Sequence, residues 1–209
     1  MNYKPTLPLF ISFEGIEGSG KSTQAKILYD FLKQKEYPVI LTREPGGTAI
    51  GNNIREILID KKNNQINPLT ELMLNFASRI EHLQQVILPA LKNKQIVITD
   101  RFYDSTLAYQ GFAMGVEIET IEKVHQLIIN SIQPDITFLC DMEVEVAFQR
   151  IKSRSDNNRY EELSFDFHNK VRNGFLKIAQ DNASRIKIIN ANNDVSKVAE
   201  QIVKYLDFN

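Results

Sequence analysis

The chain has 209 residues, of which 43% are hydrophobic and 24% are charged, close to the averages of globular proteins and far from those of disordered or fibrous chains. Its 25 Lys and Arg nearly balance its 26 Asp and Glu, so no overall field favours nucleic acid or an acidic membrane surface. The N-terminus has no signal-peptide pattern, and no apolar run approaches the about 18 residues of a membrane span. We therefore expect a cytoplasmic protein that binds neither nucleic acid nor membrane, with a single domain over residues 1–209.

The first strand-like run, "PLFISF", leads into the glycine-rich segment "EGIEGSGKST" and then into a helix-type pattern. This segment matches G-x-x-x-x-G-K-[ST], and its strand-to-helix setting is the one that a phosphate-binding P-loop requires. Glycines let the backbone turn its N–H groups toward a phosphate, and the helix N-terminus adds about half a positive charge. A glycine-rich turn with an incidental lysine is the alternative. We predict that ATP is bound by Gly15, Ile16, Glu17, Gly18, Ser19, Gly20, Lys21, Ser22 and Thr23.

Two residues of the loop have more specific predicted roles. Lys21 is expected to reach the β- and γ-phosphates, and the Ser22 hydroxyl is expected to ligate Mg²⁺. From Thr23 to Lys35 apolar residues recur on one stripe, which predicts a helix. The next strand-like run, "YPVILT", continues into the turn-forming segment "TREPGGT".

A long helix pattern opens at Asn67, a candidate N-cap, with Pro68 in its first turn. It runs towards "VILPALKN", where Pro89 is expected to kink or end the helix near its C-terminus. The strand-like run "KQIVIT" follows and leads to Asp100 and Arg101, and ligands of open α/β sheets collect at such carboxyl ends. We predict that Asp100 positions Mg²⁺ or its waters and that Arg101 binds a second phosphate. An ion pair just beyond the strand is the alternative.

The last third of the chain carries two more strand-like runs, "DITFLCD" and "RIKIIN". The first contains Cys140, the only cysteine, which we interpret as a buried core residue of a protein in a reducing compartment. Residues 152–163, "KSRSDNNRYEEL", are polar and densely charged, and we expect them to form a lid insertion. A final helix pattern begins at Asp194, a candidate N-cap.

Strands that alternate with helices predict an α/β fold, a three-layer sandwich with a five-stranded parallel sheet of the P-loop NTPase type. The chain has no N-K-x-D tetrapeptide, which a GTPase uses to read its base, so that class fits poorly. His82, His125 and His168 show neither metal-ligand spacing nor a nucleophile partner, and we assign them no catalytic role. These patterns predict phosphoryl transfer from a nucleoside triphosphate but do not identify the acceptor.

Seven segments, in order along nearly the whole chain, resemble the thymidylate kinase family, whose members phosphorylate dTMP to dTDP with ATP. They are "FEGIEGSGKSTQ", "TREPGGT", "ELMLNFASRIEHLQQVILPAL", "DRFYDSTLAYQG", "LCDMEVEVAFQRI", "RYEELSFDFHNKVRNGF" and "IINANNDVSKV". The resemblance implies transfer of the γ-phosphoryl of MgATP to dTMP, in the service of dTTP synthesis and DNA replication. It also implies a homodimer with the long helix at its interface.

The resemblance assigns catalytic roles to Lys21, Arg101, Arg154 and Arg159. Family members that lack an arginine at the position of Gly18 carry arginines in the lid instead, as this chain does. Positive charge there would stabilise the transferring γ-phosphoryl, and a solvated charged lid is the alternative. Asn158 stands where many members have an acid.

For the acceptor, the resemblance implies contacts with the sugar, the phosphate and the base. Glu17 would accept a hydrogen bond from the deoxyribose 3′-hydroxyl, and Arg79 would bind the thymine carbonyl edge. Tyr109 would crowd the sugar 2′ position, and a core tyrosine is the alternative there. The implied acceptor-binding residues are Glu17, Arg55, Arg79, Arg101, Ser105, Thr106, Tyr109 and Gln110, and the metal ligands are Ser22 and Asp100.

One position departs from the family pattern. A phenylalanine that stacks on thymine is usual four residues before Arg79, where this chain has Asn75 followed by Phe76. One helical residue is about 100° of rotation, so Phe76 cannot simply replace that ring. A kinase for another deoxynucleotide or deoxynucleoside is therefore the nearest alternative function. A regulatory or assembly protein that binds nucleotide without an acceptor is the alternative from another class.

Overall fold

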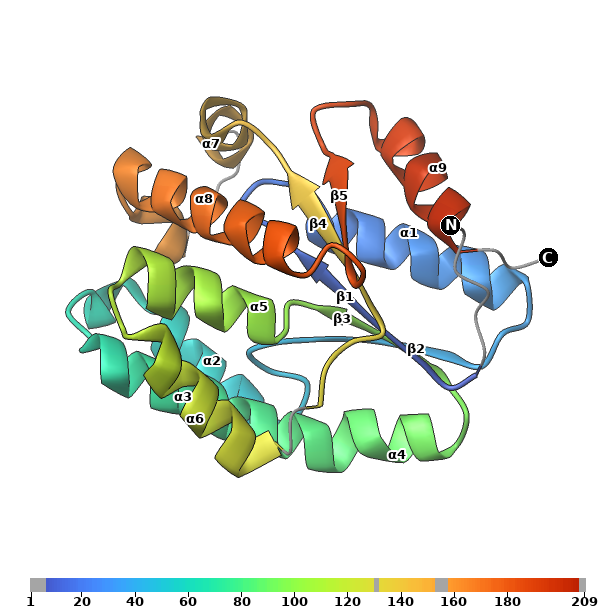
Figure 1. Cartoon of the computed structure of the whole chain (residues 1–209), viewed down its shortest axis with the longest axis horizontal. Helices are drawn as coiled ribbons and strands as arrows, with labels where there is room; N and C mark the ends of the chain where they lie inside the picture. Colours follow the sequence, from blue (N-terminus) through green and yellow to red (C-terminus); the bar gives the residue numbers. More distant parts are fainter. Residues whose placement is uncertain (1–6, 130–131, 153–157, 207–209) are drawn as a thin grey trace.

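A parallel sheet of five strands forms the centre of the chain. Figure 1 shows the computed structural model, in which residues 7–129, 132–152 and 158–206 are described. The strands are β1 (Leu9–Glu14), β2 (Val39–Arg43), β3 (Ile96–Asp100), β4 (Ile136–Asp141) and β5 (Ile186–Asn190). Their order in space is β2-β3-β1-β4-β5, and all neighbouring strands are parallel. The predicted α/β fold with a five-stranded parallel sheet is confirmed.

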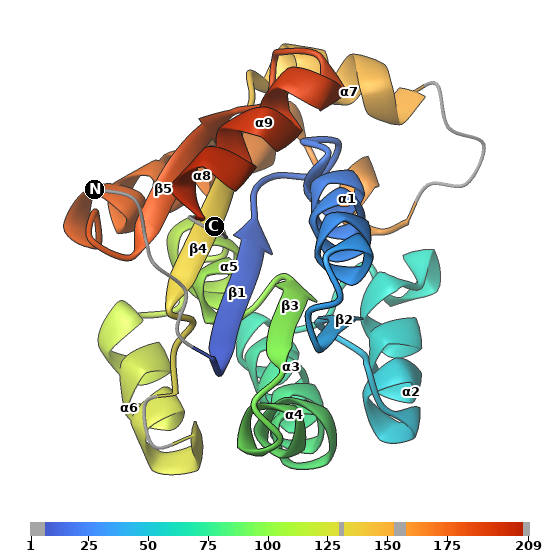
Figure 2. The same ribbon diagram turned by 90° about the vertical axis from the view of Figure 1, so that its right-hand side faces the viewer.

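Helices connect the strands and cover both faces of the sheet (Figure 2). They are α1 (Lys21–Gln34), α2 (Ala49–Ile59), α3 (Pro68–His82), α4 (Leu88–Lys92), α5 (Tyr103–Thr106), α6 (Ile118–Ile129), α7 (Val144–Lys152), α8 (Phe165–Asp181) and α9 (Val195–Tyr205). The π-helical segments η2 (Leu83–Ile87) and η3 (Leu107–Ala113) follow α3 and α5, and short 3₁₀ turns lie at Lys61–Asn63 and Tyr160–Glu162. Within the described ranges no helix is long and apolar enough to cross a bilayer.

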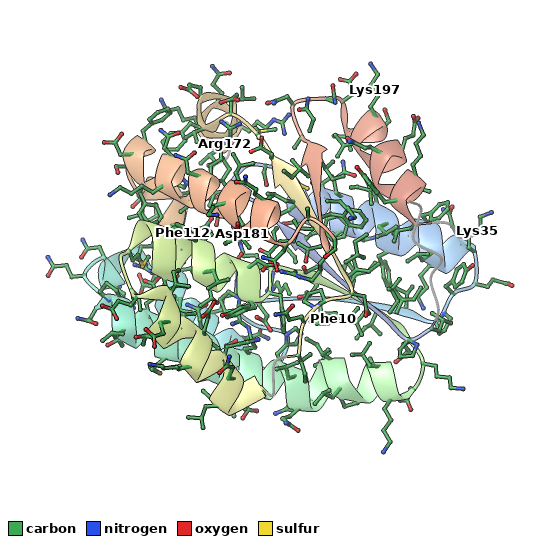
Figure 3. All side chains as sticks on the ribbon, viewed as in Figure 1. Phe10, Lys35, Phe112, Arg172, Asp181 and Lys197 are labelled. Carbon is green, nitrogen blue, oxygen red and sulfur yellow. The ribbon has the colours of Figure 1, made fainter. Side chains whose placement is uncertain are left out.

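The side chains of β1 explain why its sequence is mostly apolar. Leu9 and Ile11 belong to the core cluster that includes α1 and α9, whereas Phe10 belongs to the cluster with α3 and α4. A strand covered on both faces buries every residue, and all six residues of β1 are buried. In Figure 3, Phe10 lies within the fold, whereas Lys35 and Lys197 point outward into solvent.

The sequence predicted the starts of three helices, α1, α3 and α9. Asn67 caps α3, because its side-chain oxygen accepts a hydrogen bond from the Leu69 N–H at 2.9 Å, and that prediction is confirmed. Asp194 stands at the N-cap position of α9, but its side chain accepts no capping hydrogen bond. Its carboxylate instead lies 3.8 Å from Lys197 Nζ. The first helix begins at Lys21, two residues before the predicted start.

Pro89 lies in the first turn of α4, and the irregularity predicted there takes the form of a π-helical segment. This segment, Leu83–Ile87, directly precedes α4, which continues to Lys92. Proline has no N–H, and its ring crowds the carbonyl four residues earlier, here that of Gln85. The wider turn at this carbonyl lets the helix continue past the proline.

Candidate active site

The segment between β1 and α1 forms the predicted strand–loop–helix P-loop. Gly15 and Gly18 have φ values of 143° and 78°, in the region that favours glycine. A Cβ added at either position would lie 2.6 Å from a backbone carbonyl oxygen, that of Cys140 or of Ala147. The Ser19 hydroxyl oxygen is buried without a hydrogen-bond partner among the described residues, as expected of a group that awaits a ligand.

A cavity of about 210 Å³ opens at the carboxyl ends of β1, β2 and β3. All the residues predicted to bind the acceptor line it, namely Glu17, Arg55, Arg79, Arg101, Ser105, Thr106, Tyr109 and Gln110. Lys21, Ser22 and Asp100 line the same cavity. A second hollow, of about 400 Å³, is lined by the P-loop, Arg150 and the segment that joins β5 to α9. The P-loop therefore borders both spaces.

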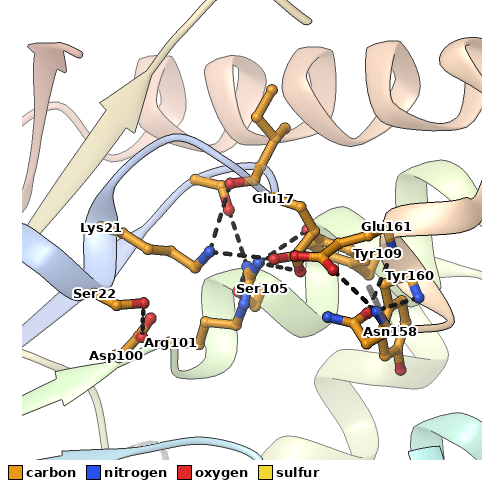
Figure 4. A network of polar contacts seen from close by, with 12 residues as sticks. Glu17, Lys21, Ser22, Asp100, Arg101, Ser105, Tyr109, Asn158, Tyr160 and Glu161 are labelled. Carbon is orange, nitrogen blue, oxygen red and sulfur yellow. Dashed lines mark hydrogen bonds and ion pairs between the residues drawn. The ribbon is translucent and has the colours of Figure 1, made fainter. Parts of the chain in front are cut away.

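Arg101 follows β3 directly and makes four side-chain hydrogen bonds (Figure 4). One terminal nitrogen donates to the Gly15 carbonyl at 3.0 Å and to Ser105 Oγ at 2.9 Å. The other donates to Glu17 Oε1 at 2.6 Å and to the Tyr109 hydroxyl at 3.0 Å. Its φ of 72° is unusual for a residue with a side chain, so its surroundings must hold this conformation.

Glu17 is a carboxylate between two cations. Lys21 Nζ lies 3.6 Å from Glu17 Oε2, and an Arg101 terminal nitrogen lies 2.6 Å from Glu17 Oε1. Burial alone would raise the pKa of Glu17, but the charges of Arg101 and Lys21 outweigh it and hold the pKa well below its usual value. Burial alone would lower the pKa of Arg101, and Glu17 outweighs that effect and raises it. Both groups are therefore ionised at neutral pH.

Arg79 lies on α3 with one nitrogen unused. Its Nε donates to Glu44 Oε2 at 2.6 Å and one terminal nitrogen donates to Thr106 Oγ1 at 3.0 Å. Glu44 also pairs with His82 Nδ1 at 2.9 Å. The other terminal nitrogen of Arg79 is buried without a partner among the described residues. Because the side chain lines the cavity, this N–H pair is suited to donate to a ligand carbonyl.

A group of arginines gives the cavity its positive charge. Arg55 donates to the Pro45 carbonyl at 3.2 Å, and Arg43 lines the cavity beside it. The pKa of Arg55 is lowered, first by burial and then by the charge of Arg43, with Arg101 adding to the effect. Crowded guanidinium groups of this kind favour an anionic ligand, above all a phosphate that can accept two hydrogen bonds from each fork.

Ser22 and Asp100 fit a site for Mg²⁺. The Ser22 hydroxyl donates to Asp100 Oδ2, and Asp100 Oδ1 is buried without a partner in the described part of the chain. Hydroxyl and carboxylate oxygens are hard donors, which Mg²⁺ prefers. The described residues contain no group of three or more His, Cys, Asp or Glu side chains that could hold a metal ion by themselves. A cation here would take its other ligands from water and from nucleotide phosphates, as Mg²⁺ usually does.

The chain is similar to known proteins over almost its full length. Residues 13–202 match the family model described as Thymidylate kinase. The thymidylate kinase of Wolbachia pipientis subsp. Culex pipiens is 46% identical over 199 residues, 93% of this chain and 94% of that protein. The thymidylate kinase of Pelobacter propionicus is 42% identical over 200 residues, 93% of this chain and 91% of the relative. The chain belongs to the thymidylate kinase family.

A crystal structure of thymidylate kinase from Ehrlichia chaffeensis has the same fold. It superimposes with a TM-score of 0.75 at 36% sequence identity and covers 94% of this chain and 97% of its own. The resemblance predicted from seven sequence segments is thus confirmed over nearly the whole chain.

The position that departs from the thymidylate kinase family pattern lies at the cavity. Asn75 lines it, and its side-chain amide donates to the Glu71 carbonyl at 2.9 Å. Phe76 is 1% exposed and belongs to the core cluster with α3 and α4. The centre of its ring lies 5.3 Å from the central guanidinium carbon of Arg79. As its rotation about the helix predicts, the Phe76 ring does not take the place of a stacking ring in the cavity.

Of the two arginines in the predicted lid, the structure describes one. Arg154 lies outside the described residues. Arg159 is 5% exposed and is anchored to α2 and α3: its Nε donates to the Leu58 carbonyl at 2.8 Å, and a terminal nitrogen contacts Glu71 Oε2 at 2.5 Å. The predicted contact of Arg159 with the γ-phosphoryl therefore stays a prediction. Asn158 caps the turn after it, because its side-chain oxygen accepts a hydrogen bond from the Tyr160 N–H at 2.9 Å.

Several buried acids were not predicted as site residues, Glu71 and Glu14 among them. Glu71 on α3 accepts hydrogen bonds from Gln110 at 2.8 Å and from the Tyr160 hydroxyl at 3.0 Å, besides its contact with Arg159. Glu14, the last residue of β1, accepts the Ser105 hydroxyl at 2.5 Å. The sequence signal was the position of Glu14 at the end of a mostly apolar run. An acid in such a run is notable because acids are almost never fully buried unless they are paired.

Proposed function

We propose that this protein transfers the γ-phosphoryl of MgATP to dTMP, which gives dTDP and ADP and serves dTTP synthesis. The observation that carries the proposal is a single cavity that brings the P-loop residue Lys21 together with an arginine-rich acceptor wall. A nucleotide-binding regulatory protein would need the P-loop but has no use for that wall. Membership of the thymidylate kinase family supports dTMP as the acceptor.

The acceptor phosphate is proposed to bind between Arg101 and Arg55. A nucleoside monophosphate is already an anion near neutral pH, so its oxygen attacks without a dedicated general base. The fixed fork of Arg101 would align that oxygen with the γ-phosphoryl, and alignment is a large part of catalysis in such reactions. Glu17 would accept the sugar 3′-hydroxyl, and the unused nitrogen of Arg79 would donate to a thymine carbonyl.

On the donor side, the P-loop amides and Lys21 would neutralise the charge that develops on the transferring group. Ser22 and Asp100 would hold Mg²⁺, which would withdraw negative charge from the phosphates. Arg154 and Arg159 are proposed to add positive charge from the lid. For Arg159 this requires that its contact with Glu71 break when ATP binds.

Two further properties are proposed. Apolar side chains are exposed on α2 and α3, namely Ile50, Ile57, Leu69 and Met73, with 52%, 46%, 51% and 47% of their surface accessible. This supports a homodimer that buries the long helix, because clustered exposed apolar groups are typical of interfaces. Cys140 is buried and unpaired, which supports a reducing, cytoplasmic setting.

The test is acceptor-dependent ADP release with MgATP and a panel of dTMP, dUMP, dCMP and thymidine. We expect turnover to require dTMP and to be lost in Lys21→Ala. Lys26→Ala, on the same helix but exposed and ion-paired with Asp30, should behave as wild type. Tight ATP binding without release on any acceptor would replace the kinase by a regulatory nucleotide-binding protein. Turnover mainly on dUMP, dCMP or thymidine would change the acceptor.

A further inference from the structure

We propose that Glu14 is a positioning residue that fixes Arg101 through Ser105, and that it takes up a proton when the acceptor phosphate binds. The inference rests on the proposed function, because it concerns the site that would receive dTMP. It goes beyond that function in assigning a role to an acid that lies outside the cavity lining.

The hydrogen bonds of Glu14 tie β1 to the loop after β3. Its side chain is fully buried. Oε1 accepts a hydrogen bond from the Phe102 N–H at 2.8 Å, and Oε2 accepts one from the Ser105 hydroxyl at 2.5 Å. The same Ser105 oxygen accepts a hydrogen bond from Arg101 at 2.9 Å. Glu14 therefore holds both the backbone after Arg101 and the tip of its guanidinium.

Arg101 needs such support because its backbone is strained. A φ of 72° costs free energy in a residue with a Cβ, and it persists only where neighbouring contacts enforce it. The backbone on either side of Arg101 is bonded, since its N–H donates to the Phe13 carbonyl and its carbonyl accepts the Thr99 hydroxyl, both at 2.9 Å. The contacts of Glu14 complete this support at Phe102 and at Ser105.

The Glu14 carboxylate has no ion-pair partner among the described residues, and both of its hydrogen-bond donors are neutral. The charged or titratable groups that face it are Asp104 on α5, Arg101 after β3, Arg185 before β5 and Cys140 on β4. Arg185 is already paired with Asp104 through two nitrogens at 2.7 and 2.8 Å. Burial, and then the like charge of Asp104, raise the pKa of Glu14 to about 8, although Ser105, Arg101 and the Phe102 N–H oppose the rise.

A bound acceptor phosphate would change this balance. It would place new negative charge on Arg101 and so weaken the attraction that favours the ionised form of Glu14, which would raise the pKa of Glu14 further. The proton comes from solvent and binds the Glu14 carboxylate, whose O–H then donates to Ser105 Oγ. The Ser105 O–H, which had donated to Glu14, is released to turn into the cavity that Ser105 lines. Glu14 thus couples acceptor binding to the direction of the Ser105 hydrogen bond.

This coupling makes both the proton uptake and the affinity for dTMP depend on pH. Because binding raises the pKa of Glu14 above its value of about 8 in the free protein, wild-type protein at about pH 8 takes up a fraction of a proton per dTMP bound. The dTMP phosphate is then already fully ionised, since phosphate monoesters lose their second proton near pH 6. The affinity for dTMP therefore weakens as the pH rises from about 7 to about 9, because deprotonated Glu14 opposes binding.

The experiment is titration calorimetry of dTMP binding at about pH 8 in HEPES and in Tris, whose different ionisation enthalpies report the proton uptake. We expect uptake in wild type and none in Glu14→Gln, whose amide donates to Ser105 as the protonated acid would and whose affinity should not change with pH. Glu119→Gln, an exposed glutamate ion-paired with Lys123 on α6, is the matched control and should keep the wild-type uptake.

A second variant tests the positioning role. Glu14→Leu removes both hydrogen bonds, and we expect it to raise KM for dTMP about tenfold with KM for ATP unchanged, whereas Glu14→Gln restores KM. If Glu14→Leu fails to fold, the proton uptake measured by calorimetry in wild type and in Glu14→Gln still tests the inference. Wild-type binding without proton uptake, or uptake that persists in Glu14→Gln, would overturn the inference alone. Absence of any dTMP binding would overturn the proposed function and the inference with it.

Discussion

The two sides of the cavity are built differently. On the acceptor side, protein partners fix the guanidinium groups: Arg101 makes four hydrogen bonds, and Arg79 is held by Glu44 and Thr106. On the donor side, the Ser19 hydroxyl and Asp100 Oδ1 are buried without partners among the described residues. The acceptor side is therefore organised before any ligand arrives, whereas the donor side would be completed by the phosphates and the cation that are proposed to bind there.

This difference has an energetic consequence. Groups that are already oriented need no reorganisation when the reaction occurs, which favours catalysis. The same groups also stabilise the fold, because breaking a buried ion pair leaves an uncompensated charge. Substitutions on the acceptor side should therefore reduce both activity and stability, and substitutions on the donor side should reduce activity with little effect on stability.

Among the substitutions that test the difference between the two sides, Arg101→Ala should have the largest effect. We expect kcat/KM for dTMP to fall roughly 10³-fold, because the phosphate loses its aligned donor. The free energy of unfolding should fall as well, since Glu17 loses its nearest cation. Steady-state kinetics and urea denaturation measure the two effects. Arg172→Ala, which breaks ion pairs with Asp141 and Glu143 outside the cavity, should keep kcat/KM; a loss below tenfold in Arg101→Ala would contradict the assigned role.

The next prediction separates two roles for Arg159. If Arg159 leaves Glu71 to contact the γ-phosphoryl, kcat should fall about 100-fold in Arg159→Ala. Glu71→Gln should then lower kcat less than about tenfold, because it weakens the contact that competes with ATP. Rapid-quench measurement of the chemical step tests this directly. Equal losses in the two single variants and in the double variant would instead make Arg159 an anchor that fixes the lid on α3.

The dependence of the unfolding free energy on acidic pH tests whether the charge of Glu17 stabilises the fold. Its pKa is held below the ordinary 4.5 in the folded chain, so the ion pair stabilises the fold above that pH and its contribution is lost as pH falls below it. We expect wild type to exceed Glu17→Gln in unfolding free energy by more than about 2 kcal/mol at neutral pH. Urea denaturation from pH 7 to pH 3 should show this difference shrinking below about pH 4.5. A difference that does not change with pH would mean that the carboxylate charge is not what stabilises the fold.

The fold was predictable because its signals are local. Short apolar runs fixed the strands, and the spacing of Gly15, Gly20 and Lys21 identified the P-loop. The buried network was not predictable in the same way, because its partners are far apart in the chain. Ser105 and Glu14 are separated by 91 residues, and Arg159 and Glu71 by 88. Which acid meets which base is decided by the packing of whole elements, and a single sequence carries no periodic signal for it.

Asn75 offers the smallest and most selective test of the acceptor side. Family resemblance places a stacking ring at this position, and here the asparagine amide instead bonds to the Glu71 carbonyl on its own helix. Asn75→Phe should place an aromatic ring on the cavity wall, and stacking on thymine is worth about 1 kcal/mol. We therefore expect KM for dTMP to fall about fivefold with little change in kcat, measured beside dUMP and dCMP. Lys123→Phe, which adds a ring at an exposed position of α6, should change neither. If Asn75→Phe raised KM instead, the ring would be filling space that the base needs, and the acceptor wall would be adapted to asparagine rather than lacking a phenylalanine.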